Sequence, residues 1–207
     1  MRLSILIPLA SLMLAACSSH NDGKAFELPD FGSGARHVVV SGDTAANGLA
    51  LMGTDGKAYL MLGNDSNAAS TVVYRRNSSN ARWSRVPETT ESPTLAVQLN
   101  EADAATSPTL PSTVTTLRTS LNDSVVTFTL QPSGNIVASG SGCQISGKLN
   151  DAVGQPAARV KLRFEQCGSI TGNYRGVAFV DADAANADVH IVVDNGKTIQ
   201  DFYVYAQ

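Results

Sequence analysis

Arg159-Val160-Lys161-Leu162-Arg163-Phe164-Glu165 is the stretch that decides the fold, because charged and apolar residues alternate along all of it. In a β-strand, successive side chains point to opposite faces of the sheet. The valine, leucine and phenylalanine of this stretch therefore face a core, and the four charged side chains face water. The pattern predicts a half-buried strand.

The same period of two recurs on both sides of this stretch, and turn-forming residues separate the repeats. Strands of six to nine residues joined by short turns are typical of an antiparallel meander. We therefore expect an all-β fold, with the meander forming a barrel or a sandwich. The alternating segments are centred on Val126-Phe128-Leu130, Val189-Ile191-Val193 and Phe202-Val204, and the turns lie at Asn122-Asp123, Pro132-Gly134 and Asn195-Gly196.

The first half of the chain also reads as strands, among them two runs that flank the hairpin signal Asp55-Gly56. Residues 103–112 are rich in Pro, Ser and Thr, and we interpret them as a linker between β subdomains at 37–102 and 113–207. Glu101 to Ala105 could instead begin a short helix. Whether the two subdomains share one continuous sheet is open. The predicted strands are 38–40, 49–52, 58–62, 71–74 and 94–99.

The N-terminus has the three parts of an export signal: Arg2, an apolar run over residues 3–14, and the small residues Ala15 and Ala16. About 12 apolar residues are too few for a transmembrane helix, which needs roughly 20. We assign residues 1–16 to a signal peptide and residues 17–36 to a flexible tether, because Gly and Pro interrupt every period there.

Leu14-Ala15-Ala16-Cys17 resembles the lipobox of bacterial lipoproteins. The resemblance implies that Cys17 becomes the lipid-bearing first residue of the mature chain, held in the membrane by three acyl chains. Ser18 stands where Asp would favour inner-membrane retention, which implies the outer membrane, with the body periplasmic or surface-exposed. An ordinary signal peptide with a spare cysteine is the alternative.

With Cys17 assigned to lipid, Cys143 and Cys167 remain as an even pair in an oxidising compartment, and we predict a disulfide between them. Two buried free thiols are the alternative. Cys143 shares its phase with Ile145 and should face the core. Cys167 is out of phase with Phe164, so its strand must end or bulge first, and the bridge should lie at the rim of the sheet.

A second resemblance covers roughly residues 124–183. The run Ser139–Gly147, together with Cys167 and Tyr174–Ala178, is similar to a pattern in poorly characterised β-rich lipoproteins of Gram-negative envelopes. That resemblance brings no activity with it.

Composition and motifs argue against several functional classes. Arg2 is one of 15 basic side chains, so the mature chain keeps 14 against 18 acidic ones, a net charge of −4, which argues against nucleic-acid binding. The sequence contains neither a G-x-S-x-G elbow nor H-E-x-x-H, and no Cys/His spacing for a metal. We expect no enzyme, no cofactor and no metal. His190 is interpreted as a surface histidine, and Asp181, Asp183 and Asp188 as a solvated hairpin tip.

One basic cluster remains as a candidate partner-binding site: Arg75, Arg76, Arg82 and Arg85 gather around Trp83. Arginine matches carboxylates and phosphates, and Trp is a favoured interface anchor. The alternative is a solvated loop whose arginines pair with Glu88 and Glu91 and in which Trp83 caps a core.

The sequence predicts a non-enzymatic outer-membrane lipoprotein that binds or inhibits another envelope protein. The alternative is a structural, assembly or adhesion-support role in an outer-membrane complex. The oligomeric state is open.

Overall fold

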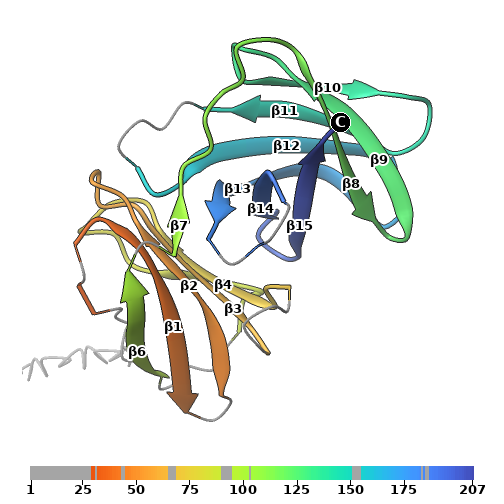
Figure 1. Cartoon of the computed structure of the whole chain (residues 1–207). Helices are drawn as coiled ribbons and strands as arrows, with labels where there is room; N and C mark the ends of the chain where they lie inside the picture. The colour runs from red at the N-terminus through yellow and green to blue at the C-terminus, as the bar shows by residue number, and fades with distance from the viewer. Residues whose placement is uncertain are drawn as a thin grey trace, which may run out of the picture.

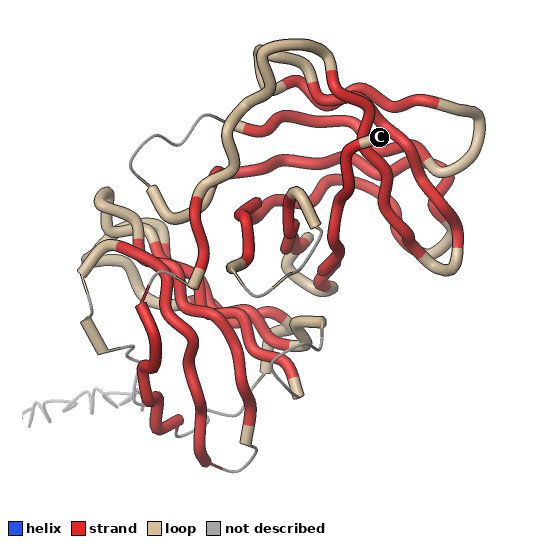
Figure 2. Tube along the Cα trace, viewed as in Figure 1, coloured by secondary structure: helices blue, strands red, loops and turns tan. Residues whose placement is uncertain are grey.

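The computed structural model describes residues 29–30, 32–42, 45–64, 69–89, 95–102, 104–150, 155–182, 184 and 187–207. Within these ranges the chain forms β-strands, turns and loops, with no helix (Figure 2). Every strand pairing is antiparallel, as the alternating pattern predicted. The all-β prediction is therefore confirmed, and the strands are divided between two sheets (Figure 1).

The N-terminal sheet has six strands in the order β5-β4-β3-β2-β1-β6. Its hairpin between β2 and β3 turns at Asp55-Gly56, where the Gly53 N–H donates to the Lys57 carbonyl and Gly56 takes a φ of 73°. The strands are β1 Gly34–Gly42, β2 Ala46–Met52, β3 Ala58–Gly63, β4 Val72–Arg76, β5 Ser84–Val86 and β6 Leu95–Ala102.

The C-terminal sheet closes into an eight-stranded barrel, because β12 pairs with β11 on one side and with β13 on the other. A ninth strand, β7 (Ala105–Thr106), adds to the end of β13. The barrel strands are β8 Thr115–Leu121, β9 Ser124–Leu130, β10 Asn135–Ser139, β11 Gln144–Leu149, β12 Ala158–Cys167, β13 Ile170–Asp181, β14 Val189–Asp194 and β15 Ile199–Ala206.

The barrel interior is filled by the inward residues that the alternation identified, including Val160, Leu162 and Phe164 of β12. Phe164 is fully buried and meets Tyr174 edge to face, with ring centroids 5.1 Å apart. Such aromatic pairs contribute about 0.5–1.5 kcal/mol beyond the area they bury. The interior of the barrel is thus a packed hydrophobic core.

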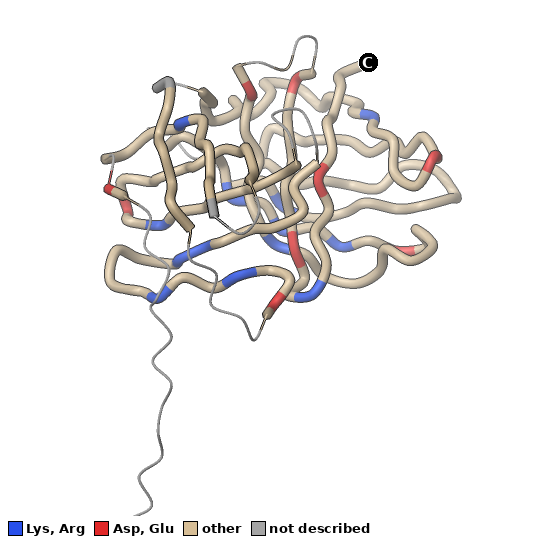
Figure 3. Tube along the Cα trace, turned by 90° about the horizontal axis from the view of Figure 1, so that it is seen from below, with Lys and Arg blue, Asp and Glu red and all other residues tan. Residues whose placement is uncertain are grey.

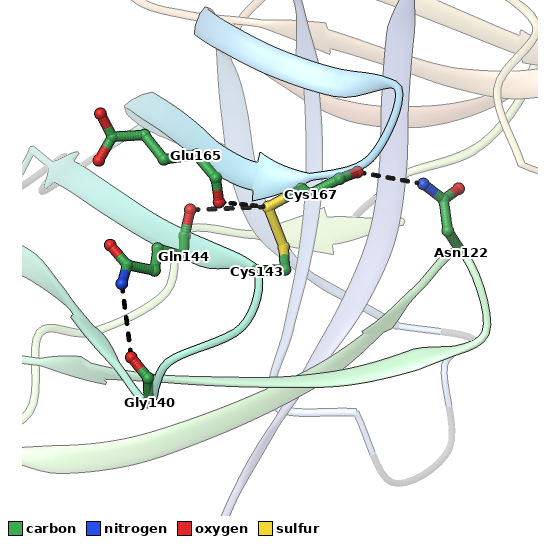
Figure 4. The surroundings of a disulfide bond; sticks show 6 residues. All are labelled: Asn122, Gly140, Cys143, Gln144, Glu165 and Cys167. Carbon is green, nitrogen blue, oxygen red and sulfur yellow. Dashed lines mark hydrogen bonds between the residues drawn. A yellow bond between two sulfur atoms is a disulfide. The ribbon is translucent and has the colours of Figure 1, made fainter.

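The predicted disulfide between Cys143 and Cys167 is present (Figure 4). Cys143 directly precedes β11 and packs against the barrel core, and Cys167 is the last residue of β12. The register between β12 and β13 shifts between Phe164 and Cys167, where Gln166 has a φ of 58°. The strand therefore bulges before Cys167, and the bulge turns the Cys167 side chain to the same inner face as Phe164. This is the strand end or bulge that the sequence predicted.

A second apolar cluster joins the two sheets. Val177, Phe179 and Val192 point outward from the barrel wall and pack against the six-stranded sheet, which contributes Leu51 and Met61 among others. Strands β13 and β14 are consequently buried on both faces, unlike β12. The two halves are separate sheets that share a core, which answers the question the sequence left open.

The segments flanking the N-terminal sheet belong to the packed body. β1 begins at Gly34, three residues before the predicted subdomain, and Ala35 is buried in the core between the sheets. Within the predicted linker, Ala104 and Ala105 are buried in that same core. The short helix considered for Glu101 to Ala105 is wrong, since β6 extends to Ala102 and β7 begins at Ala105.

Among the described residues, no helix has the length and hydropathy to cross a bilayer. Cys17 and the signal sequence before it lie outside the described residues.

Candidate functional site

Arg75, the first residue of the predicted basic cluster, faces the barrel rather than solvent. Its guanidinium Nη1 lies 2.9 Å from Oδ2 of Asp194 at the end of β14, and the two side chains are 11% and 2% exposed. Burial raises the pKa of Asp194, and the charge of Arg75 and the N–H of Gly196 offset part of that effect. Arg75 therefore joins the two sheets and is not available to an outside partner.

The rest of the predicted cluster is spread over β4, β5 and the connection between them. Arg76 lies over the ring of Trp83, 5.1 Å from its centroid, and Trp83 packs against the apolar face of the six-stranded sheet that points away from the barrel. Arg85 donates to the carbonyl of Pro87, and Arg82 is exposed. Trp83 thus caps a core, as the alternative expected, whereas Arg75 pairs with Asp194 and Glu91 lies outside the described residues.

The interpretation of His190 as a surface histidine is wrong. Its side chain keeps only 11% of its exposure and lies between the two sheets, where it stacks on Tyr203 with ring centroids 4.1 Å apart. The error has a physical cause: His190 faces outward from the barrel together with Val192, and the second sheet covers that outer face. Apolar residues in both phases of β13 and β14 were the signal that both faces are buried.

Both ring nitrogens of His190 face carboxylates. Nε2 lies 2.6 Å from Oδ1 of Asp201, and Nδ1 lies 3.5 Å from Oδ2 of Asp181, an ion-pair distance rather than a hydrogen bond. Burial disfavours the charged ring, but the two carboxylates outweigh burial and raise the pKa of His190. Burial also acts on Asp201, yet bonds from His190 and Ser70 hold its pKa below the ordinary value.

Asp201 extends this cluster across the boundary between the sheets. Its Oδ2 accepts a hydrogen bond of 2.7 Å from the N–H of Ser70, which precedes β4 of the other sheet. Tyr203 donates to Asp181, and burial together with the two carboxylates raises the pKa of Tyr203 to about 12. We call His190, Asp181, Asp201, Tyr203 and Ser70 the inter-sheet cluster.

The inter-sheet cluster is suited to holding a proton rather than transferring one. A general base needs a nitrogen free to accept, and both nitrogens of His190 face acceptors instead. The small cavity beside it, about 40 Å³, is also lined by His37 of β1. The cluster therefore has a structural place between the sheets, and Asp201 bonds to Ser70 of the other sheet.

The three aspartates expected at a solvated hairpin tip have different environments. Asp181 belongs to the inter-sheet cluster, and Asp188 accepts a hydrogen bond from the N–H of Ala206. Asp183 lies outside the described residues. Among the residues that the structure describes, no group of three or more His, Cys, Asp or Glu side chains is arranged to hold a metal ion.

A basic surface on the barrel was not singled out from the sequence. Lys148 of β11, Lys161 of β12 and Arg175 of β13 are direct partners in the strand register, so they form one row across three strands. An open cavity of about 500 Å³ lies over this row, and Arg163 also lines it. Figure 3 shows most Lys and Arg positions on one side of the body. Only strand register could have revealed the row, because the three residues are far apart in sequence.

The basic row lies on the surface of the barrel, whereas the inter-sheet cluster is largely buried between the sheets. Comparison with models of protein families, with curated proteins and with solved structures found no match to this chain.

Proposed function

We propose that this chain is a lipid-anchored protein of the cell envelope that binds another molecule at the outer membrane and does not convert it chemically. The proposal for the anchor rests on Leu14-Ala15-Ala16-Cys17 and on Ser18 after it. The proposal for binding rests on the structure of the body that follows.

The observation that carries the binding proposal is how the body uses its charged side chains. Asp201, which is paired with His190, joins the barrel to the other sheet through the N–H of Ser70, and Asp194 joins it through Arg75. A further contact links Thr54 of the β2–β3 turn to Gln155 of the barrel. The groups best suited to acid–base chemistry are therefore engaged in building one rigid body, which leaves the basic row as its most distinctive exposed chemistry.

A rigid body lowers the entropic penalty of binding, because few groups must be ordered when a partner arrives. The shared apolar core and the polar contacts around it fix the two sheets relative to each other. This arrangement favours a binding surface of fixed shape.

The anchor is tested by expressing the full chain and its Cys17→Ser variant in a Gram-negative host. We expect the wild-type chain to incorporate labelled palmitate and to sediment with outer membranes, and the variant to do neither. Equal membrane association of both chains would contradict the proposal. The structural alternative, an assembly or adhesion-support role, requires position at the membrane above all, so it fails if an unlipidated form complements a deletion fully.

The binding surface is tested by placing a photo-crosslinking amino acid at one of two exposed positions in the full chain. Arg163 lies beside the basic row with 61% of its side chain exposed, and Val125 of β9 is 73% exposed and does not line the cavity. We expect crosslinks in cells from position 163 and fewer from position 125. Crosslinks from position 125 alone would contradict binding through the basic surface.

A further inference from the structure

The row formed by Lys148, Lys161 and Arg175 is unusual in its charge. Neighbouring strands in a sheet are about 4.8 Å apart, so three adjacent strands bring the three cations within about 10 Å of one another. Like charges directly opposite each other on neighbouring strands are destabilising. The chain as a whole has a net charge of −3, so the row does not follow from a basic composition.

Nearby carboxylates do not neutralise this row. Among the described residues that line the cavity above it, four are basic and only Asp194 is acidic. Asp194 lies opposite Arg175 in the register of β13 and β14, but its carboxylate is bound by Arg75 of the other sheet and by the N–H of Gly196. Arg163, the fourth basic residue, pairs with the exposed Glu165. None of the three cations of the row therefore forms an ion pair within the described part of the chain, and the carboxylate nearest to Arg175 is already engaged by Arg75.

The side chains of the row differ in how firmly they are held. Nζ of Lys148 lies 3.1 Å from Oδ1 of Asn135 and also donates to the carbonyl of Ser133, so it contributes a charge at a fixed position. Within the described part of the chain, Lys161 and Arg175 make no hydrogen bond or ion pair. Arg175 acts on Asp194 only through space. Lys161 and Arg175 are thus exposed and available to a ligand, and Lys148 beside them is held in position by its own hydrogen bonds.

The cavity over the row is large enough for a small organic ligand. Its volume is about 500 Å³, within the range of ligand pockets. Gly147 and Gly196, which have no side chains, line this cavity. Position 147 requires glycine, because a Cβ there would lie 2.0 Å from the carbonyl oxygen of Lys161. Asn173, opposite Arg163 in the register, adds an amide that can donate or accept.

We propose that the basic row binds a ligand that carries two phosphate groups. One phosphate ester has a charge of about −1.5 to −2 at neutral pH, so two of them balance the three cations. The planar guanidinium of Arg175 matches a phosphate through two parallel hydrogen bonds, and Lys161 adds a point charge beside it. The ligand is either a diphosphorylated lipid headgroup or a free diphosphate compound. The inference rests on the proposed binding function and names its chemistry.

The test uses the full lipidated chain in neutral detergent, titrated calorimetrically with inorganic pyrophosphate at two salt concentrations. The variant is Lys161→Gln with Arg175→Gln, and the matched control is Arg82→Gln with Arg118→Gln, which removes the same charge from exposed positions outside the cavity. We expect at least a tenfold loss of affinity in the variant and less than a threefold change in the control. Binding by the wild-type chain should weaken as salt increases.

A competition experiment identifies the chemical class of the ligand, and a vesicle-binding experiment identifies its source. Citrate should compete much more weakly than pyrophosphate, and equal competition would overturn the assignment to phosphate. Vesicles of neutral lipid containing diphosphoryl lipid A should bind the wild-type chain more strongly than vesicles with monophosphoryl lipid A if the ligand is a membrane headgroup. Binding of pyrophosphate without that preference supports a free diphosphate compound.

The thermal midpoint separates a binding role from a structural one. Because Lys161 lies opposite the like charges of Lys148 and Arg175, and Arg175 makes no ion pair with Asp194, the Lys161→Gln and Arg175→Gln variant should unfold at the same temperature as the wild type or higher. A lower midpoint, an equal loss of binding in the control, or no binding of either phosphate probe to the wild type would overturn the inference. In the last case, crosslinks from position 163 would still support the proposed binding function.

Discussion

Replacing His190 by glutamine should lower the free energy of unfolding by about 3 kcal/mol. His190 and Asp201 are both buried, with side chains 11% and 5% exposed. Removing one partner of a buried ion pair typically costs about 3–5 kcal/mol, because the other charge stays buried and uncompensated. We expect the low end of that range, since glutamine can still donate to Asp201 and Asp181 remains 17% exposed.

The pH dependence of unfolding should change in a defined window. The pKa of His190 is raised in the folded state, so its stabilising contribution is complete below the unfolded value, about 6.5, and is lost as pH rises through the folded value. Inside that window the folded state binds one more proton than the unfolded state. The free energy of unfolding should therefore fall by about 1.4 kcal/mol per pH unit.

Asp201 acts at a different pH. Its pKa is lowered in the folded state, so its contribution is complete above the unfolded value of 3.8 and is lost as pH falls through the folded value. Any acid-side loss from Asp201 thus lies below the window assigned to His190.

The assay is urea unfolding of the wild type and of His190→Gln at half-unit steps from pH 5 to pH 9, followed by circular dichroism. The difference between the two chains cancels the titration of every group that does not contact His190, and it reports on His190 together with the carboxylates that it contacts. We expect the difference to be largest near pH 6 and to shrink as pH rises. Parallel profiles above pH 6.5 would refute the account of the inter-sheet cluster.

Three further predictions concern stability. Arg75→Ala should lower the free energy of unfolding in urea by about 3–5 kcal/mol, because it leaves the buried Asp194 without its ion-pair partner. The control variant Arg82→Ala, at an exposed position, should change that free energy by no more than about 0.5 kcal/mol. Equal effects of the two substitutions would contradict the ion pair. The double variant Cys143→Ala with Cys167→Ala should lose about 3.5 kcal/mol of folding stability, because the disulfide closes a loop with a sequence separation of 24. This loss corresponds to a fall in the thermal midpoint on the order of 10 °C, and an unchanged midpoint would argue against the disulfide. Gly176→Ala should cost about 1–3 kcal/mol, because its Cβ would lie 2.0 Å from the carbonyl oxygen of Val192; a stability equal to wild type in the same unfolding assay would contradict that close approach.

The sequence predicted the barrel well because barrel strands alternate strictly. Val160, Leu162 and Phe164 all face the core, and the parity of Cys167 led to the bulge at Gln166. These features depend on the alternation of side chains along one strand, which can be read from a single sequence.

The candidate site was harder to predict because it depends on contacts between distant segments. The phase of His190 was read correctly as outward, but the outer face of β14 is covered by another sheet. Arg75 likewise meets Asp194, a residue 119 positions away. The basic row combines three strands whose register the sequence does not display.

The most direct measurement for the proposed anchor is mass spectrometry of the N-terminal tryptic peptide from chain purified from membranes. Trypsin cuts after Lys24, so the account predicts a peptide of residues 17–24 carrying three acyl chains on Cys17. An unmodified Cys17, or a peptide that extends upstream of it, would contradict the claim that this body is displayed from a lipid anchor.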